Sequence, residues 1–258
     1  MASIGLKYLA WAPIATEPTN AEPTCGIGRV LGKMISSNLA ITNSEGKLFA
    51  DDMLAEYISE FSSAEFTAET DNISLADQAA IYGARYEDDE LRLTAGDNAP
   101  YGGYGGYQQL SVGNVRKFRA WLFAKGKASV PDETGATKGE SVSFGNQPLK
   151  VTVSAPNFGP WKKVKEFTTE AAAKAYIDTA LGVVAWHSID VQVNGAGAGE
   201  SAAPAGVTPV ANAGSFELVI TGTVTALYDN GVEVSASIAG GKYTLSNVVA
   251  DHTISVIF

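Results

Sequence analysis

The segment LFADDMLAEYISEFSSAEFTAET spans residues 48–70. Its first half is rich in Ala, Met, Leu and Glu, which favour helices. The second half alternates instead: Glu65, Thr67 and Glu69 would share one face of a strand, with Phe66 on the other. We therefore expect an extended conformation with an acidic face.

The first half of this segment alternates in the same way. A polar break, Ser62-Ser63, separates it from the second half. We expect two extended pieces joined by a kink at this break, each with one acidic face. Such a sheet is suited to line a surface that must not hold nucleic acid, because carboxylates repel phosphate. The alternating residues of the first piece are Glu56, Ile58 and Glu60, between Tyr57, Ser59 and Phe61.

Composition limits the classes of function. The chain has 258 residues, 45% of them hydrophobic, which is enough for a buried core. The net charge of −10 argues against a general nucleic-acid binder, which needs cations to neutralise phosphates. The single cysteine, Cys25, excludes an internal disulfide. Neither a secretory signal nor an apolar run of ~20 residues is evident, so we expect synthesis and folding in the cytoplasm.

The distribution of glycine, proline and apolar residues predicts two domains. The first covers residues 1–193, a linker rich in Ala, Gly and Pro covers 194–215, and a small all-β domain covers 216–258. The fold class expected is mainly β with flanking helix. Two turn signals, at 229–231 and 239–241, separate short strands of the small domain.

Prolines and polar runs predict loops within the first domain. Pro13, Pro18 and Pro23 space out a segment, residues 12–24, that we expect to be a loop or arm. The polar residues 36–46 are expected to form another loop. Strand regions are expected at residues 4–11, 27–34, 101–107 (with a bulge), 116–130 and 140–154, and a hairpin with an acidic tip at 86–93.

Two segments carry helix signals. In the first, Ser74 can cap the start and Gly83 the end, with Leu75, Ala79 and Tyr82 facing the core. The second runs from Thr168 to Gly182 and is rich in alanine. Its expected buried side consists of Ala172, Ala175, Tyr176, Thr179 and Ala180.

The residues predict neither an enzyme nor a cofactor or metal site. His187 and His252 lie near no nucleophile motif, and one cysteine with two scattered histidines lacks zinc spacing. The glycines of residues 25–32 follow a proline-rich segment rather than a strand, so we expect a turn and not a dinucleotide loop. The acidic pairs at 51–52 and 87–90 lack a calcium-loop pattern. Tyr101, Tyr104 and Tyr107 are expected to pack in the core or between subunits.

Several motifs follow one another in a fixed order along the chain. They are MASIGLKY (1–8), LFADDMLAE (48–56) with Glu60-Phe61, Ala99-Pro100-Tyr101, Trp121-Leu122-Phe123, TKGES (137–141), and the alanine-rich helix with Tyr176 and Asp178. Together and in this order, they resemble the major tail proteins of long-tailed phages and prophages of Gram-positive bacteria, over about residues 1–190. Residues 243–258 look like the end of small β repeats of bacterial and phage surface proteins.

This resemblance implies a β-sandwich or barrel tail-tube fold with a flanking helix and an outward C-terminal β domain, Ig-like or repeat-like. Subunits would form hexameric rings that stack into a virion tail tube, assembled in the host cytoplasm, whose acidic lumen conducts DNA. Implied partners are further copies of the chain and the tape measure, distal tail and terminator proteins. Lumen-facing candidates are Glu65, Thr67 and Glu69; inter-subunit candidates are Asp51, Asp52, Glu56, Pro13 and Pro18.

Two other functions remain open. The tyrosine run and the terminal β domain are also compatible with a carbohydrate- or cell-surface-binding protein, and host glycans are an expected partner of that domain. A hydrolase is a poor alternative, because no activated nucleophile or metal site can be assembled from these residues.

Overall fold

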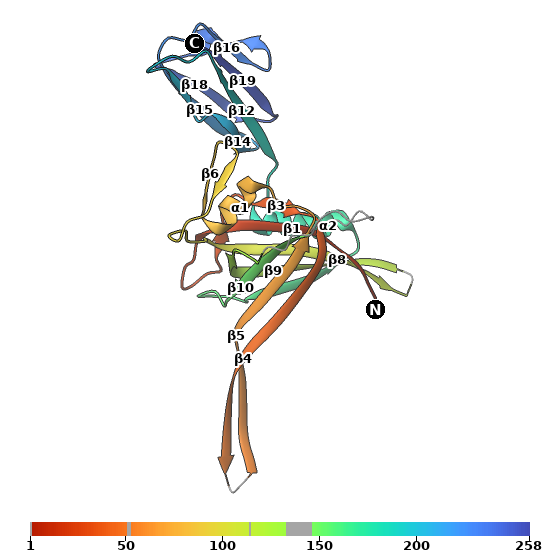
Figure 1. Cartoon of the computed structure of the whole chain (residues 1–258). Helices are drawn as coiled ribbons and strands as arrows, with labels where there is room; N and C mark the ends of the chain where they lie inside the picture. Colours follow the sequence, from red (N-terminus) through yellow and green to blue (C-terminus); the bar gives the residue numbers. More distant parts are fainter. Residues whose placement is uncertain (1, 51–52, 114, 133–145) are drawn as a thin grey trace, which may run out of the picture. The chain divides into compact units, whose positions relative to one another are not determined.

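The computed structural model describes residues 2–50, 53–113, 115–132 and 146–258 (Figure 1). The chain is mainly β, as the sequence predicts, with two α-helices among the described residues. It divides into two compact units, each with its own core. The first unit comprises Met1–Ala84 and Thr94–Val183, and the second comprises Arg85–Leu93 and Val184–Phe258.

A nine-stranded sheet forms the first unit. Seven strands follow the order β2-β1-β8-β9-β10-β5-β4, while β3 pairs with β1 and β11 pairs with β9. All of these pairings are antiparallel. The strands are β1 (Ala2–Thr16), β2 (Thr24–Cys25), β3 (Arg29–Gly32), β4 (Met34–Ala50), β5 (Met53–Thr70), β8 (Tyr101–Val112), β9 (Val115–Ser129), β10 (Gln147–Val153) and β11 (Lys162–Phe167).

The Tyr-Gly-Gly repeat lies in β8, which is buried from both sides. A Cβ added at Gly105 would lie 2.7 Å from Leu122 Cδ2 and 3.1 Å from Ile177 Cγ2. Glycine at this position therefore lets helix α2 (Glu170–Leu181) pack directly on the sheet. A register shift between Gly102 and Tyr104 confirms the predicted bulge.

Helix α2 has the predicted ends but a different buried face. Thr169 accepts a hydrogen bond from the Ala172 N–H, and Gly182 ends the helix at φ 58°. Ala173, Ile177 and Leu181 are buried. These side chains recur every four residues and include the largest apolar ones, so their burial removes the most apolar area from water. The predicted face was wrong: Tyr176 is partly buried, and Ala172, Ala175, Thr179 and Ala180 are exposed.

Helix α1 (Leu75–Tyr82) confirms the predicted Ser74 cap and the Gly83 end. The burial of Ala79 and Tyr82 is also confirmed, but Leu75 is exposed and Ile81 is buried in its place.

One loop prediction in the first unit was wrong, and a second was wrong in part: of residues 12–24, residues 12–16 belong to β1, while residues 17–23 lie outside helices and strands. Residues 36–46 belong to β4 and pair with β5 along their length. Pro13 lies within β1, opposite Gly102 of β8. Proline lacks an N–H but keeps a carbonyl, and the Pro13 carbonyl accepts a hydrogen bond from the Gly26 N–H at 2.8 Å. The strand therefore continues through it.

The second unit contains two larger sheets and a small hairpin. One sheet has the order β14-β12-β19-β16-β17 and the other β13-β15-β18. Buried side chains from both sheets, such as Val191 and Leu218, form one core. The strands are β12 (Trp186–Asn194), β13 (Ser201–Ala203), β14 (Gly206–Ala211), β15 (Gly214–Thr221), β16 (Ala226–Asp229), β17 (Val232–Glu233), β18 (Lys242–Val248) and β19 (His252–Ile257), with a 3-10 turn at Ser235–Ser237.

The expected linker over residues 194–215 is not a linker in the structure. It contains β13 and β14 and contributes the buried Ala202 and Val210 to the core. Its glycines occupy turns between short strands; Gly199, for example, has φ 86°. The low complexity of this range therefore reflects tight turns and small core residues.

The predicted acidic hairpin is confirmed. Strands β6 (Arg85–Glu87) and β7 (Glu90–Arg92) are joined by Asp88 and Asp89, with φ of 53° and 58°. Two successive left-handed residues suit a tight hairpin turn. Although it lies between segments of the first unit in sequence, this hairpin belongs to the second unit.

The core of the first unit predicts a clear mutational contrast within β5. Phe66 is 3% exposed, with ring centroids 5.1 Å from both Trp121 and Phe123. Phe66→Ala should lower the free energy of unfolding by about 3–5 kcal/mol, because it leaves a cavity. Ile58→Ala, on the exposed part of the same strand, should change it by less than about 0.5 kcal/mol. Urea denaturation at low protein concentration measures both; equal effects would contradict the burial pattern.

Candidate functional site

The β4–β5 hairpin extends beyond the sheet that it belongs to (Figure 1). The two strands pair from Met34 opposite Thr70 to Ala50 opposite Met53. Strand β5 pairs with β10 only from Ala64 onwards. The remaining part, residues 42–50 and 53–63, is therefore a two-stranded projection, here called the arm.

The arm begins at the predicted kink. Thr42 lies opposite Ser63 and Asn43 lies opposite Phe61, so the register shifts at Ser62. A bulge of this kind bends a strand and increases its twist. The kink expected at Ser62-Ser63 is thereby confirmed.

Large apolar side chains are exposed along the arm. Phe49 is 65% and Met53 71% exposed. Apolar side chains gathered in this way on a surface mark an interaction site. The other large hydrophobic residues of the arm that are exposed are Leu48, Leu54, Tyr57 and Ile58.

Aromatic stacking fixes the base of the arm. The rings of Phe61 and Trp161 are nearly parallel, with an interplanar angle of 6° and centroids 4.1 Å apart. Trp161 also stacks on Phe123, a buried residue of β9. The arm is therefore joined to the core of its unit through Trp161, which lies outside the named strands.

On the predicted acidic face of β5, Glu65 is exposed and Thr67 and Glu69 are partly buried, and the charge is partly balanced. Ala64, Phe66 and Ala68 point into the core, and Glu65, Thr67 and Glu69 lie on the opposite face.

Glu65 forms an ion pair with Lys150 Nζ at 3.2 Å, and Asn146 Nδ2 donates to Glu69 Oε2 at 3.2 Å. These partners lie on or beside β10, and the sequence pattern of β5 gave no signal for them.

The predicted inter-subunit residues are not gathered in one place. Glu56 is exposed on the arm, whereas Asp51 and Asp52 lie outside the described residues. Pro13, within β1, and Pro18, two residues after its end, are partly buried. The segment with Pro18 is held by its neighbour Glu17, whose carboxylate lies 2.8 Å from Lys125 Nζ. Burial alone would raise the pKa of Glu17, but the hydrogen bonds from Lys125 and the Asn157 N–H outweigh it and lower the pKa.

The three tyrosines of β8 have different environments. Tyr104 and Tyr107 are buried, as predicted. Tyr101 is exposed, with Lys125 Nζ 4.6 Å and Lys127 Nζ 5.5 Å from its ring centroid. Strand pairing brings these lysines of β9 to Tyr101, although they are distant in the sequence.

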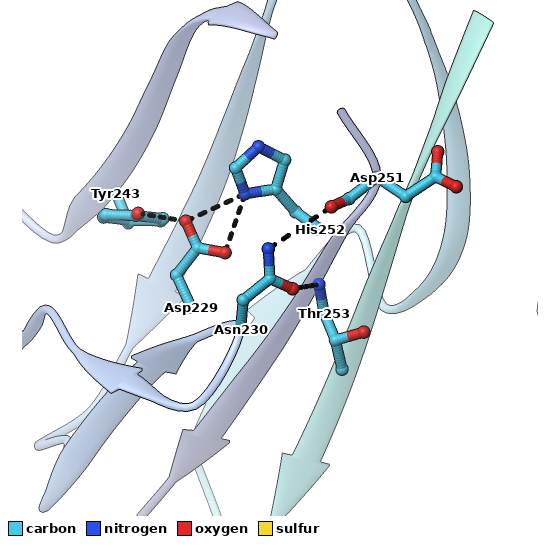
Figure 2. A network of polar contacts seen from close by, with 6 residues as sticks. All are labelled: Asp229, Asn230, Tyr243, Asp251, His252 and Thr253. Atoms are coloured by element: carbon cyan, nitrogen blue, oxygen red, sulfur yellow. Dashed lines mark hydrogen bonds and ion pairs between the residues drawn. The ribbon is translucent and has the colours of Figure 1, made fainter. Parts of the chain in front are cut away.

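A polar network in the second unit joins three strands (Figure 2). Asp229 of β16 accepts a hydrogen bond from the Tyr243 hydroxyl at 3.0 Å and lies 2.7 Å from His252 Nδ1. The neighbouring Asn230 accepts from the Thr253 N–H at 2.8 Å. Asn230 Nδ2 donates to the Asp251 carbonyl at 3.3 Å. The network ties β16, β18 and β19 of the second unit together.

The other histidine lies on the opposite side of Asp251, whose side chain rather than carbonyl it approaches. His187 Nε2 is 3.1 Å from Asn212 Oδ1, and its Nδ1 is 3.7 Å from Asp251. Across the described residues, no three His, Cys, Asp or Glu side chains are grouped to hold a metal ion. No helix in the described part of the chain is long and apolar enough to cross a membrane.

No protein-family model and no curated protein sequence matches the chain. The choice of the arm and the β5 face as candidate sites therefore rests on the geometry described above.

Burial of the second-unit network predicts a pH effect. Burial, and then the hydrogen bond to Asp229, raise the pKa of Tyr243 to about 12. An unfolded tyrosine has a pKa of about 10, so between these values the unfolded chain binds fewer protons than the folded one. The stabilisation is complete below pH ~10 and is lost as pH rises towards 12. Tyr243→Phe should remove up to roughly 2 kcal/mol of this pH dependence. Urea denaturation between pH 9 and 11.5 tests this; parallel curves for both proteins would contradict it.

Proposed function

We propose that this chain is the structural subunit of a phage tail tube, built from stacked hexameric rings that conduct DNA. The exposed apolar arm carries the proposal. Both faces of the arm meet solvent along most of its length, although it carries large apolar side chains. Such exposure is unfavourable in an isolated copy and is typical of an interaction surface.

Burial of the arm between copies would stabilise an assembly. Each large side chain such as Phe49 or Met53 contributes about 1.5–3 kcal/mol when fully removed from water. Contact between the arm and a different surface of the next copy is heterologous, and such contacts generate rings or filaments. A tube of stacked rings combines closed rings with open-ended growth along the tube axis.

The sheet edges support the same proposal. β4 pairs with β5 alone among the described strands, so one side of β4 keeps its backbone groups free. Joining edges between copies removes such free groups, as closed barrels do. The motif order of residues 1–190 adds the resemblance to tail proteins.

The charge of the chain suits DNA passage without adhesion. Its net charge is −10, and Glu65 and Glu69 lie on the exposed face of β5 that we assign to the lumen. The ion pair between Lys150 and Glu65 partly neutralises the negative charge of this face, so the expected interaction with phosphate is weak repulsion. In this function the protein is not an enzyme and needs no cofactor.

The proposed setting is the virion, after assembly in the host cytoplasm. Proposed partners are further copies and the tape measure, distal tail and terminator proteins. The second unit has a separate closed core, which favours a decorating role and leaves cell-surface binding as a second candidate function. Contact of this unit with host glycans stays a prediction.

Electron microscopy of the purified chain tests the tube directly. We expect rings or hollow tubes at high protein concentration. Phe49→Ser combined with Met53→Ser should abolish them, because the arm loses its largest exposed apolar groups. The matched control is Val232→Ser with Val249→Ser, which removes two exposed apolar groups of the second unit. Tubes that persist in the arm variant would contradict this role of the arm.

DNA release tests the lumen assignment separately. Glu65→Lys with Glu69→Lys would place cations beside Lys150, so phosphate should adhere. In assembled phage we expect ejection to slow roughly tenfold, measured by dye binding to released DNA. Glu217→Lys, an exposed change in the second unit, is the control. Normal ejection by the double variant would exclude this face from the lumen and leave the tube proposal standing.

A further inference from the structure

A groove in the first unit lies beside an open stretch of β1. Its volume is about 790 Å³. β1 pairs with β3 only from Leu9 onwards, so residues 2–8 have β8 on one side and no described strand on the other. The residues that line the groove include Tyr8, Val30, Leu31, Lys33, Met34 and Asp71.

The groove combines apolar lining with a charged rim. Leu31 and Met34 are buried, and Val30 of β3 is exposed beside them. Lys33 supplies an exposed cation, whereas Lys7 is already paired with Glu170, its Nζ lying 2.9 Å from Glu170 Oε1. An extended apolar segment with carboxylates nearby is the chemistry that such a groove fits.

Internal contacts hold the groove in shape. Tyr8 has φ 65° in a bulge of β1, and its hydroxyl donates to Asp178 at 2.5 Å. The Tyr107 hydroxyl donates to Glu170 at 2.6 Å. Asp71 accepts from the Lys33 N–H at 2.8 Å. A site formed in advance loses little conformational entropy on binding.

The arm of the same copy cannot fill this groove. Met34 lines the groove and is also the first residue of β4, whose other end carries the arm tip. β4 has 17 residues, and at 3.3 Å per residue the tip lies roughly 50 Å away. Folding back would break the β4–β5 ladder, so an apolar projection and an apolar groove remain unmatched within one copy.

We propose that the arm tip of a second copy, residues 48–49 and 53–54, docks in this groove. Exposed Leu48, Phe49, Met53 and Leu54 would meet the apolar lining. Glu56 and Glu60 are exposed and form no ion pair among the described residues, and one of them would face Lys33 at the rim. The inference rests on the proposed self-assembly and names the acceptor surface for the arm.

This contact is heterologous and directional. Each copy offers one tip and one groove, so copies link head to tail, into a closed ring or an open filament according to the rotation between them. The length of β4 then sets the spacing between linked copies at roughly 50 Å or less.

Two single variants of the full chain test the pairing by complementation. Phe49→Asp should disable the tip and Val30→Asp the groove, since each places a carboxylate in an apolar contact. Both residues are exposed, so folding should survive, as circular dichroism would verify. Each variant alone should need at least a tenfold higher concentration to assemble. An equimolar mixture should form heterodimers, through the one intact tip and the one intact groove, and nothing larger. Val232→Asp in the second unit is the control and should assemble normally.

Disulfide trapping captures the contact even when monomers predominate. In a Cys25→Ser background, Leu54→Cys with Lys33→Cys should give a ladder of linked multimers on oxidation. Leu54→Cys with Lys165→Cys, an exposed site on β11, should not. No ladder, equal ladders, or dimers formed by Leu54→Cys alone would overturn the proposal, the last by showing tip-to-tip contact. Wild-type tubes with no heterodimer in the mixture would refute this docking and leave the tube proposal intact.

Discussion

The backbone hydrogen bonds between β4 and β5 are the constraint on which this structure depends. The pair is longer than its sheet, so beyond Ala64 each strand has only the other as a partner. An isolated two-stranded hairpin is marginally stable in water. The arm therefore depends on its base, where Phe61 stacks on Trp161. Its apolar side chains require a further surface, and the open edge of β4 offers one more row of backbone groups.

The buried side chains in the last part of β5 also determine which of its side chains face away from the core. Phe66 and Ala68 are buried among aromatic and aliphatic residues, so Glu65 and Glu69 must point the other way. A slip of one residue would place both carboxylates in the core, at a cost of several kcal/mol each. The apolar core thus enforces the register of a polar surface. The bulge at Ser62 then bends the arm, while the pairing of residues 63–68 with β4 keeps its register.

The sequence predicts the parts of the fold that local chemistry specifies. Alternation along residues 64–70, the helix ends at Gly83 and Gly182, and the turn at Asp88-Asp89 all follow from short-range rules. Short-range rules do not predict which residues from distant segments a side chain will contact. Residues 36–41 lie on the edge strand of the sheet, and residues 42–46 lie in the arm, where both faces meet water. The polar composition that suits these positions also suits a loop. Lys150 reaches Glu65, and Lys125 reaches Tyr101, through strand pairing alone.

Charge and apolar exposure act in opposite directions on association. Copies with a net charge of −10 repel one another, and at physiological salt this repulsion acts over about 8 Å. A single docked tip must overcome it, whereas several simultaneous contacts per copy overcome it more easily. Repulsion spread over the surface and attraction confined to an arm therefore favour cooperative assembly over random clustering. In the proposed assembly, this separation lets one face of β5 stay acidic while the arm makes the contacts between copies.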